Sequence, residues 1–486
     1  STIGMACLGY CRPGCAVTGG RILFEGRDLC RLTTSEKRTL RGVQISYVAQ
    51  SAAASFNPAH TLMQQFCEVA LQHGIAGYDK AKAKAIALYR SMELPDPQHI
   101  GDRYPHQVSG GQLQRAMVAM AMACDPKLIV FDEPTTALDV TTQIEVLATV
   151  KKVIREHHIA VIYITHDLAV VAQLADRIMV LRYGDAVEEG PIQEILNHPK
   201  ERYTHDLLAS RKQNNPENIE NSEVILYVKG LGAAYVPGVP VVNEVNLSVR
   251  RNRTVAIVGE SGSGKSSLAR SIVGLLPRFK GEVVFKGQNL PVRLKGRSKD
   301  QLRQLQMIYQ MPDIALNPRQ KVKKILGRPI SFYFGLNGRQ KVDRIVELLE
   351  MTELPSDYLD KYPRQLSGGE KQRICIARAL AAKPELIICD EITAALDQLV
   401  AAEILKLLIR LQKETRTAYI FITHDLSTVK AVADEVMVML RGNVVEQGRK
   451  TEIFAPPHHA YTQKLIESVP EMDPAWLDNL LQQRES

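Results

Sequence analysis

The sequence lacks any apolar run long enough to cross a membrane. No stretch of about 18 uncharged apolar residues is present, and the N-terminus has no charged segment followed by an apolar one. The first absence predicts a chain without membrane-spanning helices, and the second predicts that it carries no secretory signal.

Cysteine is scarce as well. Eight cysteines in 486 residues do not form the disulfide framework of a small secreted protein. Cys7, Cys11 and Cys15 are spaced by four residues, which predicts that Cys7 and Cys11 share one face of a helix. We do not expect a metal site there, because Pro13 and Gly14 should end the helix before Cys15 and no histidine lies nearby.

The sequence also lacks a long segment in which charges of one sign are concentrated. The net charge of +8 is dispersed, apart from the basic residues between Arg293 and Lys299, and such a run is typical of a solvated loop. A positive net charge could suit nucleic acid, an anionic membrane face or a nucleotide; on the motifs described below we expect no nucleic-acid partner. The length of 486 residues predicts two or three domains, and 45% apolar with 23% charged residues is typical of soluble globular domains.

What the chain does contain is an internal repeat. Four short motifs recur at a constant offset of 258 residues, as from Ser109 to Ser367, and unrelated motifs do not keep such a register by chance. The pairs are Ser109-Gly110-Gly111 with Ser367-Gly368-Gly369, Asp132-Glu133 with Asp390-Glu391, Asp139 with Asp397, and Thr165-His166-Asp167 with Thr423-His424-Asp425.

The residues between the two copies are polar. Residues 211–223 hold a single apolar side chain, which predicts a flexible linker. We therefore expect a first domain over residues 1–210 and a second over residues 224–486.

Each copy alternates apolar runs with helical patterns. The runs 128–131, 160–165, 386–389 and 418–423 are typical of strands buried on both faces of a parallel sheet. Residues 342–349 follow helical spacing, and residues 81–94 are their counterpart in the first copy. The expected fold is α/β: two tandem domains, each with a mostly parallel sheet and a helical subdomain.

A glycine-rich loop follows the predicted strand 254–258 and precedes a helix expected from Ser267. Residues 259–266 match G-x-x-x-x-G-K-[ST] in the context that this pattern requires. The loop N–H groups and the helix N-terminus favour phosphate. Lys265 is expected to reach the β- and γ-phosphates and Ser266 to bind Mg²⁺. The predicted ATP-binding residues are Gly259, Glu260, Ser261, Gly262, Ser263, Gly264, Lys265, Ser266 and Ser267.

Two carboxylates follow the predicted strand 386–389. Asp390 is placed to hold Mg²⁺, directly or through water, and Glu391 to act on the attacking water. Phosphoryl transfer to water needs a metal, a positioned nucleophile and charge neutralisation. The sequence therefore predicts an ATPase.

Two further segments carry a family resemblance. Residues 108–115 (Val-Ser-Gly-Gly-Gln-Leu-Gln-Arg) and 366–373 (Leu-Ser-Gly-Gly-Glu-Lys-Gln-Arg) resemble the signature motif of ABC ATPases, and the likeness covers nearly the whole chain. A serine and two glycines at a helix start offer a second anion cradle, for a nucleotide held by another domain.

The resemblance implies roles for other residues. Tyr235 is the candidate to stack on adenine, with a plain core tyrosine as the alternative. Gln310 and Gln50 correspond to the Q-loop glutamines of the family, which touch Mg²⁺ and water. His424 and His166 correspond to the switch histidines, which contact the γ-phosphate. Asp397 and Asp139 correspond to D-loop residues, which lie at the dimer seam.

ABC ATPases join the P-loop of one domain to the signature of the other, which implies two sites. Site A comprises Lys265, Ser266, Gln310, Asp390, Glu391 and His424 with Ser109, Gly110, Gly111, Gln112 and Asp139. Site B comprises Ser1, Gln50, Asp132, Glu133 and His166 with Ser367, Gly368 and Gly369.

Site B has no P-loop in this sequence. Ser1-Thr2-Ile3 aligns with Ser266-Ser267-Leu268, so Lys265 has no counterpart in the first half. We expect that site B does not hydrolyse ATP. A truncated chain explains this better than a natural degenerate half, because loss of the central strand should open the sheet and because Glu133 and His166 are intact.

A narrower resemblance concerns the residues after the two glutamines. Ser-Phe-Asn-Pro at 55–58 and Ala-Leu-Asn-Pro-Arg at 315–319 resemble the S-L-N-P stretch of oligopeptide, dipeptide and nickel importer ATPases, and the tails around Tyr203 and Tyr461 agree. This implies a peripheral subunit on the cytoplasmic face of the inner (plasma) membrane, with two permease subunits and an extracytoplasmic binding protein. Some relatives carry a C-terminal cysteine cluster; no cysteine follows Cys389, so we expect no iron–sulfur cluster.

Two other functions are weighed against the importer. An exporter ATPase would share most motifs, but the Asn-Pro stretches argue against it. A soluble ABC protein acting on ribosomes or nucleic acid would carry a long charged linker, coiled coils or zinc modules, and none is found. The cargo is not named by the sequence, because the binding protein and permeases choose it. Ile392 stands where the first half has Pro134, and loss of this proline should change the stiffness of the backbone after Glu391.

Overall fold

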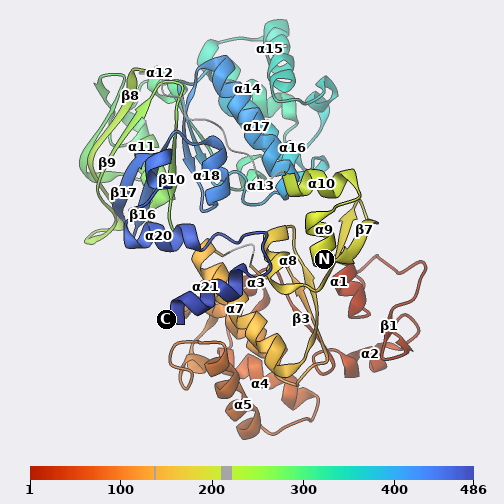
Figure 1. Ribbon diagram of the computed structural model, residues 1–486. Helices are drawn as coiled ribbons and strands as arrows, with labels where there is room; N and C mark the ends of the chain where they lie inside the picture. The colour runs from red at the N-terminus through yellow and green to blue at the C-terminus, as the bar shows by residue number, and fades with distance from the viewer. Residues whose placement is uncertain (136–137, 210–221, 486) are drawn as a thin grey trace. The chain divides into compact units, whose positions relative to one another are not determined.

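The apolar run Thr254–Val258 forms β10, an inner strand of a six-stranded sheet. Its companions are β13 (Leu305–Ile308), β14 (Leu386–Asp390), β15 (Ala418–Ile422), β16 (Glu435–Leu440) and β17 (Asn443–Arg449). The order is β13-β14-β15-β10-β16-β17, and only β17 is antiparallel to its neighbour. Figure 1 labels β10, β16 and β17 of this sheet. Every residue of β10, β14 and β15 is buried, as their continuous apolar runs predicted. The same prediction is wrong for the run 160–165, because Ala160 is exposed and the other residues of the strand Ala160–Ile164 are only half-buried.

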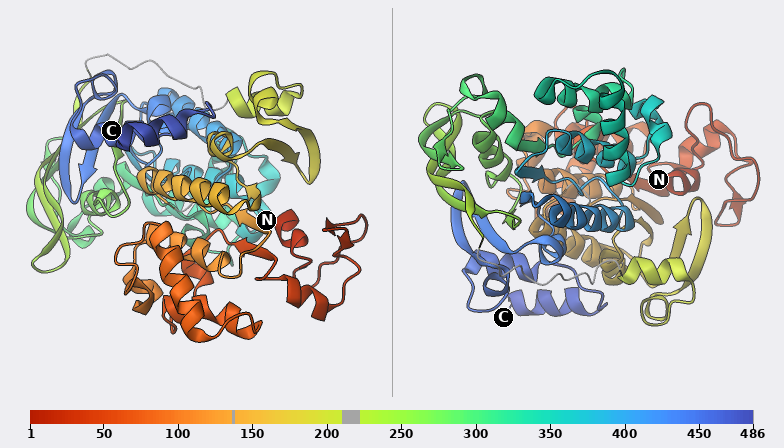
Figure 2. Two further views of the ribbon diagram at one scale, coloured as in Figure 1. Left: turned by 60° about the horizontal axis from the view of Figure 1, so that its bottom comes forward. Right: turned by 90° about the horizontal axis from the view of Figure 1, so that it is seen from above.

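An antiparallel sheet of four strands accompanies this parallel one. Its order is β12-β11-β8-β9, with β8 (Val224–Val236), β9 (Val239–Arg250), β11 (Arg278–Phe285) and β12 (Gln288–Asn289). The helix α11 (Lys265–Val273) packs its apolar residues Leu268 and Ile272 into a core shared by both sheets. Figure 2 shows the long pair β8 and β9 in two further orientations.

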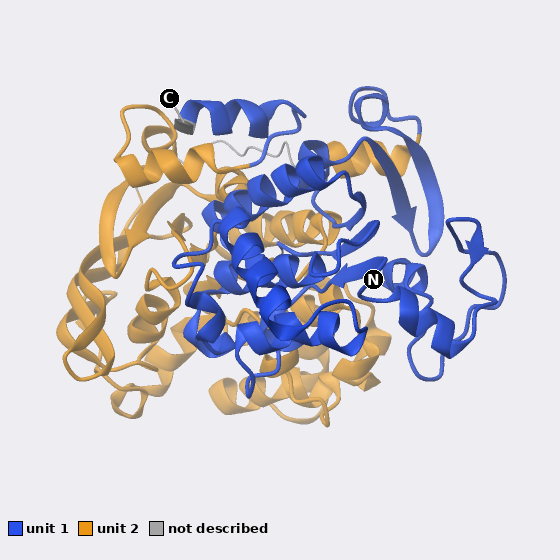
Figure 3. Ribbon diagram, turned by 90° about the horizontal axis from the view of Figure 1, so that it is seen from below, with its two compact units in different colours: residues 1–200, 470–486 blue, residues 201–469 orange. Residues whose placement is uncertain are grey.

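The computed structural model describes residues 1–135, 138–209 and 222–485. They divide into unit 1 (Ser1–Lys200 and Pro470–Ser486) and unit 2 (Glu201–Val469), coloured separately in Figure 3. These limits differ from the predicted domain limits at two places: residues 201–209 belong to unit 2, and residues 470–486 belong to unit 1. Most of the predicted linker, residues 211–221, lies outside the described residues.

The predicted helical subdomain is present in both units. Residues 342–349 lie in α15 (Gly338–Met351), and residues 81–94 correspond to α5 (Tyr78–Ser91). The remaining helices of unit 2 are α10 (Arg202–Ala209), α12 (Lys299–Gln304), α13 (Pro312–Ala315), α14 (Val322–Phe334), α16 (Gly368–Leu380), α17 (Gln398–Thr415), α18 (Leu426–Val432), α19 (Lys450–Ile453) and α20 (Ala460–Glu467).

Unit 1 repeats the plan of unit 2 with a divided sheet. The strands β3 (Ile45–Val48), β4 (Leu128–Asp132) and β5 (Ala160–Ile164) form one parallel sheet, and β6 (Arg177–Arg182) pairs with β7 (Asp185–Pro191) in another. The short strands β1 (Leu23–Phe24) and β2 (Arg27–Asp28) form a separate pair. The helices are α1 (Thr2–Cys7), α2 (Thr34–Leu40), α3 (Ala52–Ser55), α4 (Leu62–Gln72), α6 (Gly110–Ala121), α7 (Val140–His157), α8 (Leu168–Leu174), α9 (Ile192–Asn197) and α21 (Trp476–Glu485).

The two units differ in how their strands are joined. In unit 2, β10 joins β15 to β16, whereas the equivalent β5 and β6 of unit 1 lie in different sheets. Met179 on β6 is 50% exposed, whereas its counterpart Met437 is fully buried at 0%. Apolar side chains that β10 helps to cover in unit 2 therefore face outward in unit 1.

Two local predictions are corrected. The helix α1 ends at Cys7, and Gly9 follows with a positive φ of 61°, so Cys7 and Cys11 do not share a helix. The helix after the glycine-rich loop begins at Lys265 and not at Ser267. Among the described residues, no group of three or more His, Cys, Asp or Glu side chains could hold a metal ion. No helix in the part of the chain that the structure describes is long and apolar enough to span a membrane.

Candidate nucleotide site

The loop between β10 and α11 has a shape that only glycine allows at two positions. Gly259 and Gly264 have φ values of 146° and 101°, which L side chains rarely adopt. A Cβ atom would lie 2.2 Å from the carbonyl oxygen of Met439 at Gly259 and 2.5 Å from that of Val241 at Gly264. The backbone can therefore curl tightly ahead of the helix N-terminus, where free N–H groups favour an anion.

Lys265 is directed into this loop. Its side chain is buried, and its ammonium donates to the carbonyl oxygens of Gly259 at 2.8 Å and Glu260 at 2.7 Å. A buried cation among backbone groups is a ready partner for phosphate oxygens.

Ser266 and Asp390 come together at the end of β14. The Ser266 hydroxyl donates to a carboxylate oxygen of Asp390 at 2.8 Å. Burial, helped by the charge of Glu391, raises the pKa of Asp390, while Ser266, Arg270 and Lys265 oppose the rise. The strand ends thus place oxygen donors directly beside the glycine-rich loop.

Glu391 is held from two sides. Its carboxylate accepts a hydrogen bond from the Gln310 amide at 2.6 Å and lies 3.5 Å from Nδ1 of His424. Burial opposes its ionisation, but His424, Lys265 and Gln310 outweigh burial and lower the pKa of Glu391. For His424, burial favours the neutral ring, but Glu391 outweighs it and raises the pKa. Three separately predicted residues therefore form one hydrogen-bonded group.

The backbone at Glu391 is strained. Its φ is 48°, and Glu133, its counterpart in unit 1, has a φ of 49°. A non-glycine residue in the left-handed region costs of the order of 1–3 kcal/mol, and such residues cluster at functional sites. Ile392, which follows Glu391, is buried in the core of unit 2. The equivalent position of unit 1 is occupied by Pro134.

Unit 1 brings its equivalent residues together in the same way. The Ser1 hydroxyl donates to Asp132 at 3.1 Å, as Ser266 does to Asp390. Gln50 donates to Glu133 at 2.9 Å, and His166 lies 3.3 Å from the same carboxylate. The predicted residues of site B that lie in unit 1 are thus adjacent.

The signature segments begin helices in both units. Ser109 and Ser367 are the N-caps of α6 and α16, and each forms a reciprocal capping box, with Gln112 and Glu370 respectively. A Cβ atom at Gly111 would lie 2.2 Å from Thr142, so glycine permits the close approach of α7. Ser109, Gly110, Ser367 and Gly368 are exposed.

The D-loop aspartates also cap helices. Asp139 accepts from the Thr142 N–H at 3.0 Å at the start of α7, and Asp397 accepts from the Val400 N–H at 3.0 Å at the start of α17. Burial opposes ionisation of Asp139, but its hydrogen bonds with Thr142 and Thr141 outweigh burial and lower its pKa.

Tyr235 is not a core residue. It is 55% exposed at the end of β8, and its hydroxyl accepts from Arg270 at 3.0 Å and from Ser267 at 3.4 Å. The alternative of a buried packing tyrosine is therefore wrong. An exposed ring beside the start of α11 is free to stack on a base.

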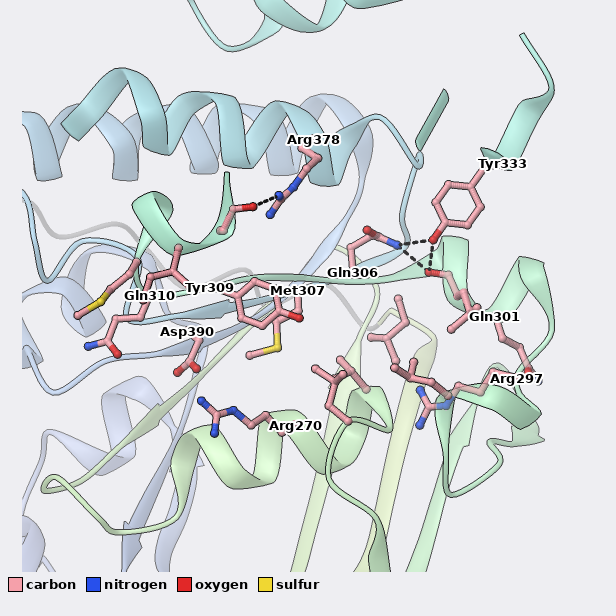
Figure 4. Close-up of a pocket in the computed structure, with 18 residues that line it drawn as sticks. Arg270, Arg297, Gln301, Gln306, Met307, Tyr309, Gln310, Tyr333, Arg378 and Asp390 are labelled. Carbon is pink, nitrogen blue, oxygen red and sulfur yellow. Dashed lines mark hydrogen bonds between the residues drawn. The ribbon is translucent and has the colours of Figure 1, made fainter. Parts of the chain in front are cut away.

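A pocket of about 810 Å³ adjoins this site in unit 2. Gln310, Asp390 and Arg270 line one end, and Figure 4 shows the Arg270 guanidinium pointing toward Asp390. The rest is lined by apolar side chains of β13 and its neighbours, by Tyr333 of α14, and by the polar side chains of Arg297, Gln301, Gln306 and Arg378. The pocket thus runs from the glutamine of the Q-loop toward the helical subdomain.

One residue at the site was missed by sequence analysis. The hydroxyl of Tyr461, on α20, accepts the Glu260 N–H of the glycine-rich loop at 2.9 Å. Tyr461 was noted only as part of a tail resemblance. The sequence signal that could have pointed to Tyr461 is the occurrence of a tyrosine at the equivalent position of the first copy, Tyr203, 258 residues earlier.

Replacing Tyr461 with phenylalanine is expected to weaken ATP binding. The change leaves a loop N–H without its acceptor, a loss of about 1 kcal/mol or roughly 5-fold in affinity. Titration with a fluorescent ATP analogue measures it. Tyr203→Phe is the matched control, since it makes the same change in the other copy, and equal losses in both variants would contradict a specific role for Tyr461.

Comparison with known proteins identifies two families. The family described as "ABC transporter" matches residues 1–136 and 242–394. The family described as "Oligopeptide/dipeptide transporter, C-terminal region" matches residues 187–226 and 445–486.

Individual relatives are similar over most of their length. The glutathione import ATP-binding protein GsiA of Salmonella choleraesuis (strain SC-B67) is 36% identical over 506 residues, covering 96% of this chain and 81% of that protein. The protein of the same name from Escherichia coli O157:H7 is 35% identical over 485 residues, covering 92% and 78%. Among solved structures, cbiO1 of Clostridium perfringens, part of an ABC transporter complex, is 31% identical with a TM-score of 0.44, covering 48% of this chain and 91% of that one.

Proposed function

The chain belongs to the ABC transporter family, and from this premise we propose that its ATPase activity powers the import of short peptides or peptide-like solutes. The match to the oligopeptide and dipeptide transporter C-terminal region supports import of this cargo class. The relatives are named for glutathione import, and glutathione is itself a short peptide. The catalytic part of the proposal is carried by one observation, the placement of Glu391 between Gln310 and His424 beside the P-loop lysine.

The residues of unit 2 divide the chemistry among them. Lys265 binds the β- and γ-phosphates, because its ammonium already lies within the curled loop. Glu391, ionised and anchored by Gln310, orients the attacking water and accepts its proton. His424 donates to the γ-phosphate region and keeps Glu391 in place.

The same site has the donors that Mg²⁺ prefers. The Ser266 hydroxyl and the Asp390 carboxylate are adjacent hard oxygen donors, and the Gln310 side chain lies on the same side of the pocket. We propose that Ser266, Asp390 and Gln310 hold the ion. When bound, Mg²⁺ neutralises negative charge on the phosphates during transfer.

We propose that the first cassette completes site A. By the family resemblance, Ser109, Gly110, Gly111 and Gln112 present the start of α6 to the γ-phosphate, and Asp139 contributes from the D-loop. The exposed serine and glycine at the helix start support this role, because a helix N-terminus with free N–H groups attracts phosphate.

We also propose that the equivalent residues of unit 1 belong to a second site, site B. Ser1, Gln50, Asp132, Glu133 and His166 are adjacent in unit 1. By the family resemblance they would pair with Ser367, Gly368 and Gly369 of the second cassette.

The proposed partners are two permease subunits and an extracytoplasmic binding protein, with the chain at the cytoplasmic face of the inner membrane. The pocket between the Q-loop and the helical subdomain supports this, since an apolar cavity with a few polar groups suits an inserted permease element. The Asn-Pro segments after the glutamines are alike in both units: Asn57 accepts from the Ala59 N–H at 3.0 Å, and Asn317 from the Arg319 N–H at 2.9 Å.

Reconstitution tests the proposal. The chain is assembled with its two permease subunits in vesicles, with peptide-loaded binding protein inside and Mg·ATP outside. We expect the loaded binding protein to raise ATP hydrolysis and peptide to move out of the lumen to the ATP side, which corresponds to the cytoplasm. Transport of solute from the ATP side into the lumen would instead indicate an exporter, and stimulation by RNA without permeases would indicate a soluble ABC protein.

A further inference from the structure

The last residues of the chain form a docking segment on unit 1. Residues 470–486 follow unit 2 in the sequence but belong to unit 1 (Figure 3). Leu477 and Leu480 of α21 are buried in one apolar cluster with Ile144 and Leu147 of α7 and Val170 of α8. We call residues 470–486 the C-terminal docking segment.

One buried glutamine holds the start of this segment. Gln173 of α8 is 2% exposed, and its amide nitrogen donates to the carbonyl oxygens of Glu471 at 2.8 Å and Asp473 at 2.9 Å. Its amide oxygen accepts the Leu477 N–H at 3.0 Å, which is one of the free donors of the first turn of α21. Because both ends of a buried amide are used, the contact selects one position of the segment.

Two cations of α7 hold the first turn of α21. Lys151 lies 2.9 Å from one oxygen of Asp478, and Arg155 lies 3.3 Å from the other. Burial opposes ionisation of Asp478, but Lys151 and Arg155 outweigh it and lower its pKa. A carboxylate in the first turn of a helix is also favoured by the helix dipole.

The docking surface is particular to the first copy of the repeat. At the fixed offset of 258 residues, Gln173 is replaced by Ala431 and Lys151 by Ile409. Neither replacement can form the hydrogen bonds or ion pair described above. The second copy keeps a cation at the position of Arg155, as Lys413, but it lacks the glutamine and the lysine that hold the segment in the first copy.

The two helices that carry this surface begin at the predicted functional loops of the first cassette. Asp139 is the N-cap of α7, and α8 follows directly after His166 with Asp167 as its N-cap. The docked residues Ile144 and Leu147 lie in the first two turns of α7.

We propose that the C-terminal docking segment is a positioning element for the D-loop and switch loop of the first cassette. The segment fixes α7 and α8 and thereby holds Asp139 in place for site A. ATP turnover therefore depends on the residues of this segment, which lie outside the motifs of both cassettes. This part rests on the proposed function, whereas the docking itself does not.

The single tryptophan of the chain reports docking directly. Trp476 is half-buried against the same apolar cluster, and the sequence contains no other tryptophan. The variant Asp478→Lys places a cation opposite Lys151 and Arg155. The side chain of Asp478 is 39% exposed, so the variant should fold. We expect Trp476 emission to shift to longer wavelength, acrylamide quenching to increase and ATP hydrolysis to fall.

Two further variants separate docking from general damage. Asn479→Lys introduces a lysine at the next position, which is exposed, and should change neither the Trp476 emission nor the rate of ATP hydrolysis. The double variant Lys151→Glu with Arg155→Glu should undock the segment. Adding Asp478→Lys to it should restore both the Trp476 emission and the rate of ATP hydrolysis. A helix that is merely damaged would recover neither.

The outcomes are distinct. Emission that is unchanged in Asp478→Lys would overturn the docking, and a red shift with an unchanged ATPase rate would overturn the positioning role. A wild-type chain with docked tryptophan emission but no ATP hydrolysis would support the docking and contradict the proposed function.

Discussion

Replacing Glu391 with glutamine is expected to lower ATP hydrolysis by about 100-fold or more, while ATP still binds. Glu391 is half-buried, its lowered pKa keeps it ionised, and Gln310 and His424 fix its orientation. Glutamine has almost the same shape but cannot accept the proton of the attacking water. The P-loop contacts of Lys265 are untouched, so binding should persist.

Phosphate release and nucleotide binding are measured separately on the same preparation. Lys265→Ala is the companion variant and should lose both binding and hydrolysis, because the cation that meets the phosphates is removed. Glu133→Gln makes the same change as Glu391→Gln at the equivalent position of the first cassette. The residues proposed for catalysis at site A are untouched in this variant, so we expect it to keep the hydrolysis of that site. Substantial turnover left in Glu391→Gln would show that site B is active.

Replacing Ser109 with arginine is expected to lower the same activity by about 100-fold, although Ser109 lies in the other cassette. Ser109 caps α6 and is exposed at the helix start proposed to face the γ-phosphate. Arginine removes the cap, at a cost of about 1 kcal/mol, and fills the space in front of the free N–H groups. Loss of stabilising donors at a transferring phosphoryl group has large effects on rate.

Ser367→Arg is the matched control for this prediction. It removes the same kind of cap at the start of α16, so any loss of stability should be similar. By the family resemblance its helix would face site B and not site A, so hydrolysis at site A should change little. Steady-state ATPase rates and thermal melting of the two variants decide the matter. Equal rates for Ser109→Arg and wild type would refute the composite site.

Much of the fold could be predicted because its signals are local. The continuous apolar runs became β4, β5, β14 and β15 within a residue or two of the expected limits. The helix predicted at residues 81–94 extends from Tyr78 to Ser91, because helix ends depend on caps more than on periodicity. Cys7 and Cys11 failed to share a helix for a similar reason, since Gly9 ends α1.

The candidate site was also predictable in its parts. The strand ends, the glycine-rich loop and the capping serines each have a motif of fixed spacing, and the structure brings Gln310, Glu391 and His424 into contact. The contact of Tyr461 with the loop was not predictable, because it joins residues 201 positions apart and a tyrosine has no required spacing from a P-loop.

The sequence by itself determined the two cassettes and their ATPase chemistry, since strand burial, phosphate loops and helix caps depend on neighbouring residues. Only the tertiary structure decided that Tyr235 is exposed, that Tyr461 holds the P-loop and that residues 470–486 pack on α7 and α8. These features depend on which surfaces meet when distant segments pack. The contact of Gln173 with Leu477 joins residues 304 positions apart, and no periodicity in the chain records such a contact.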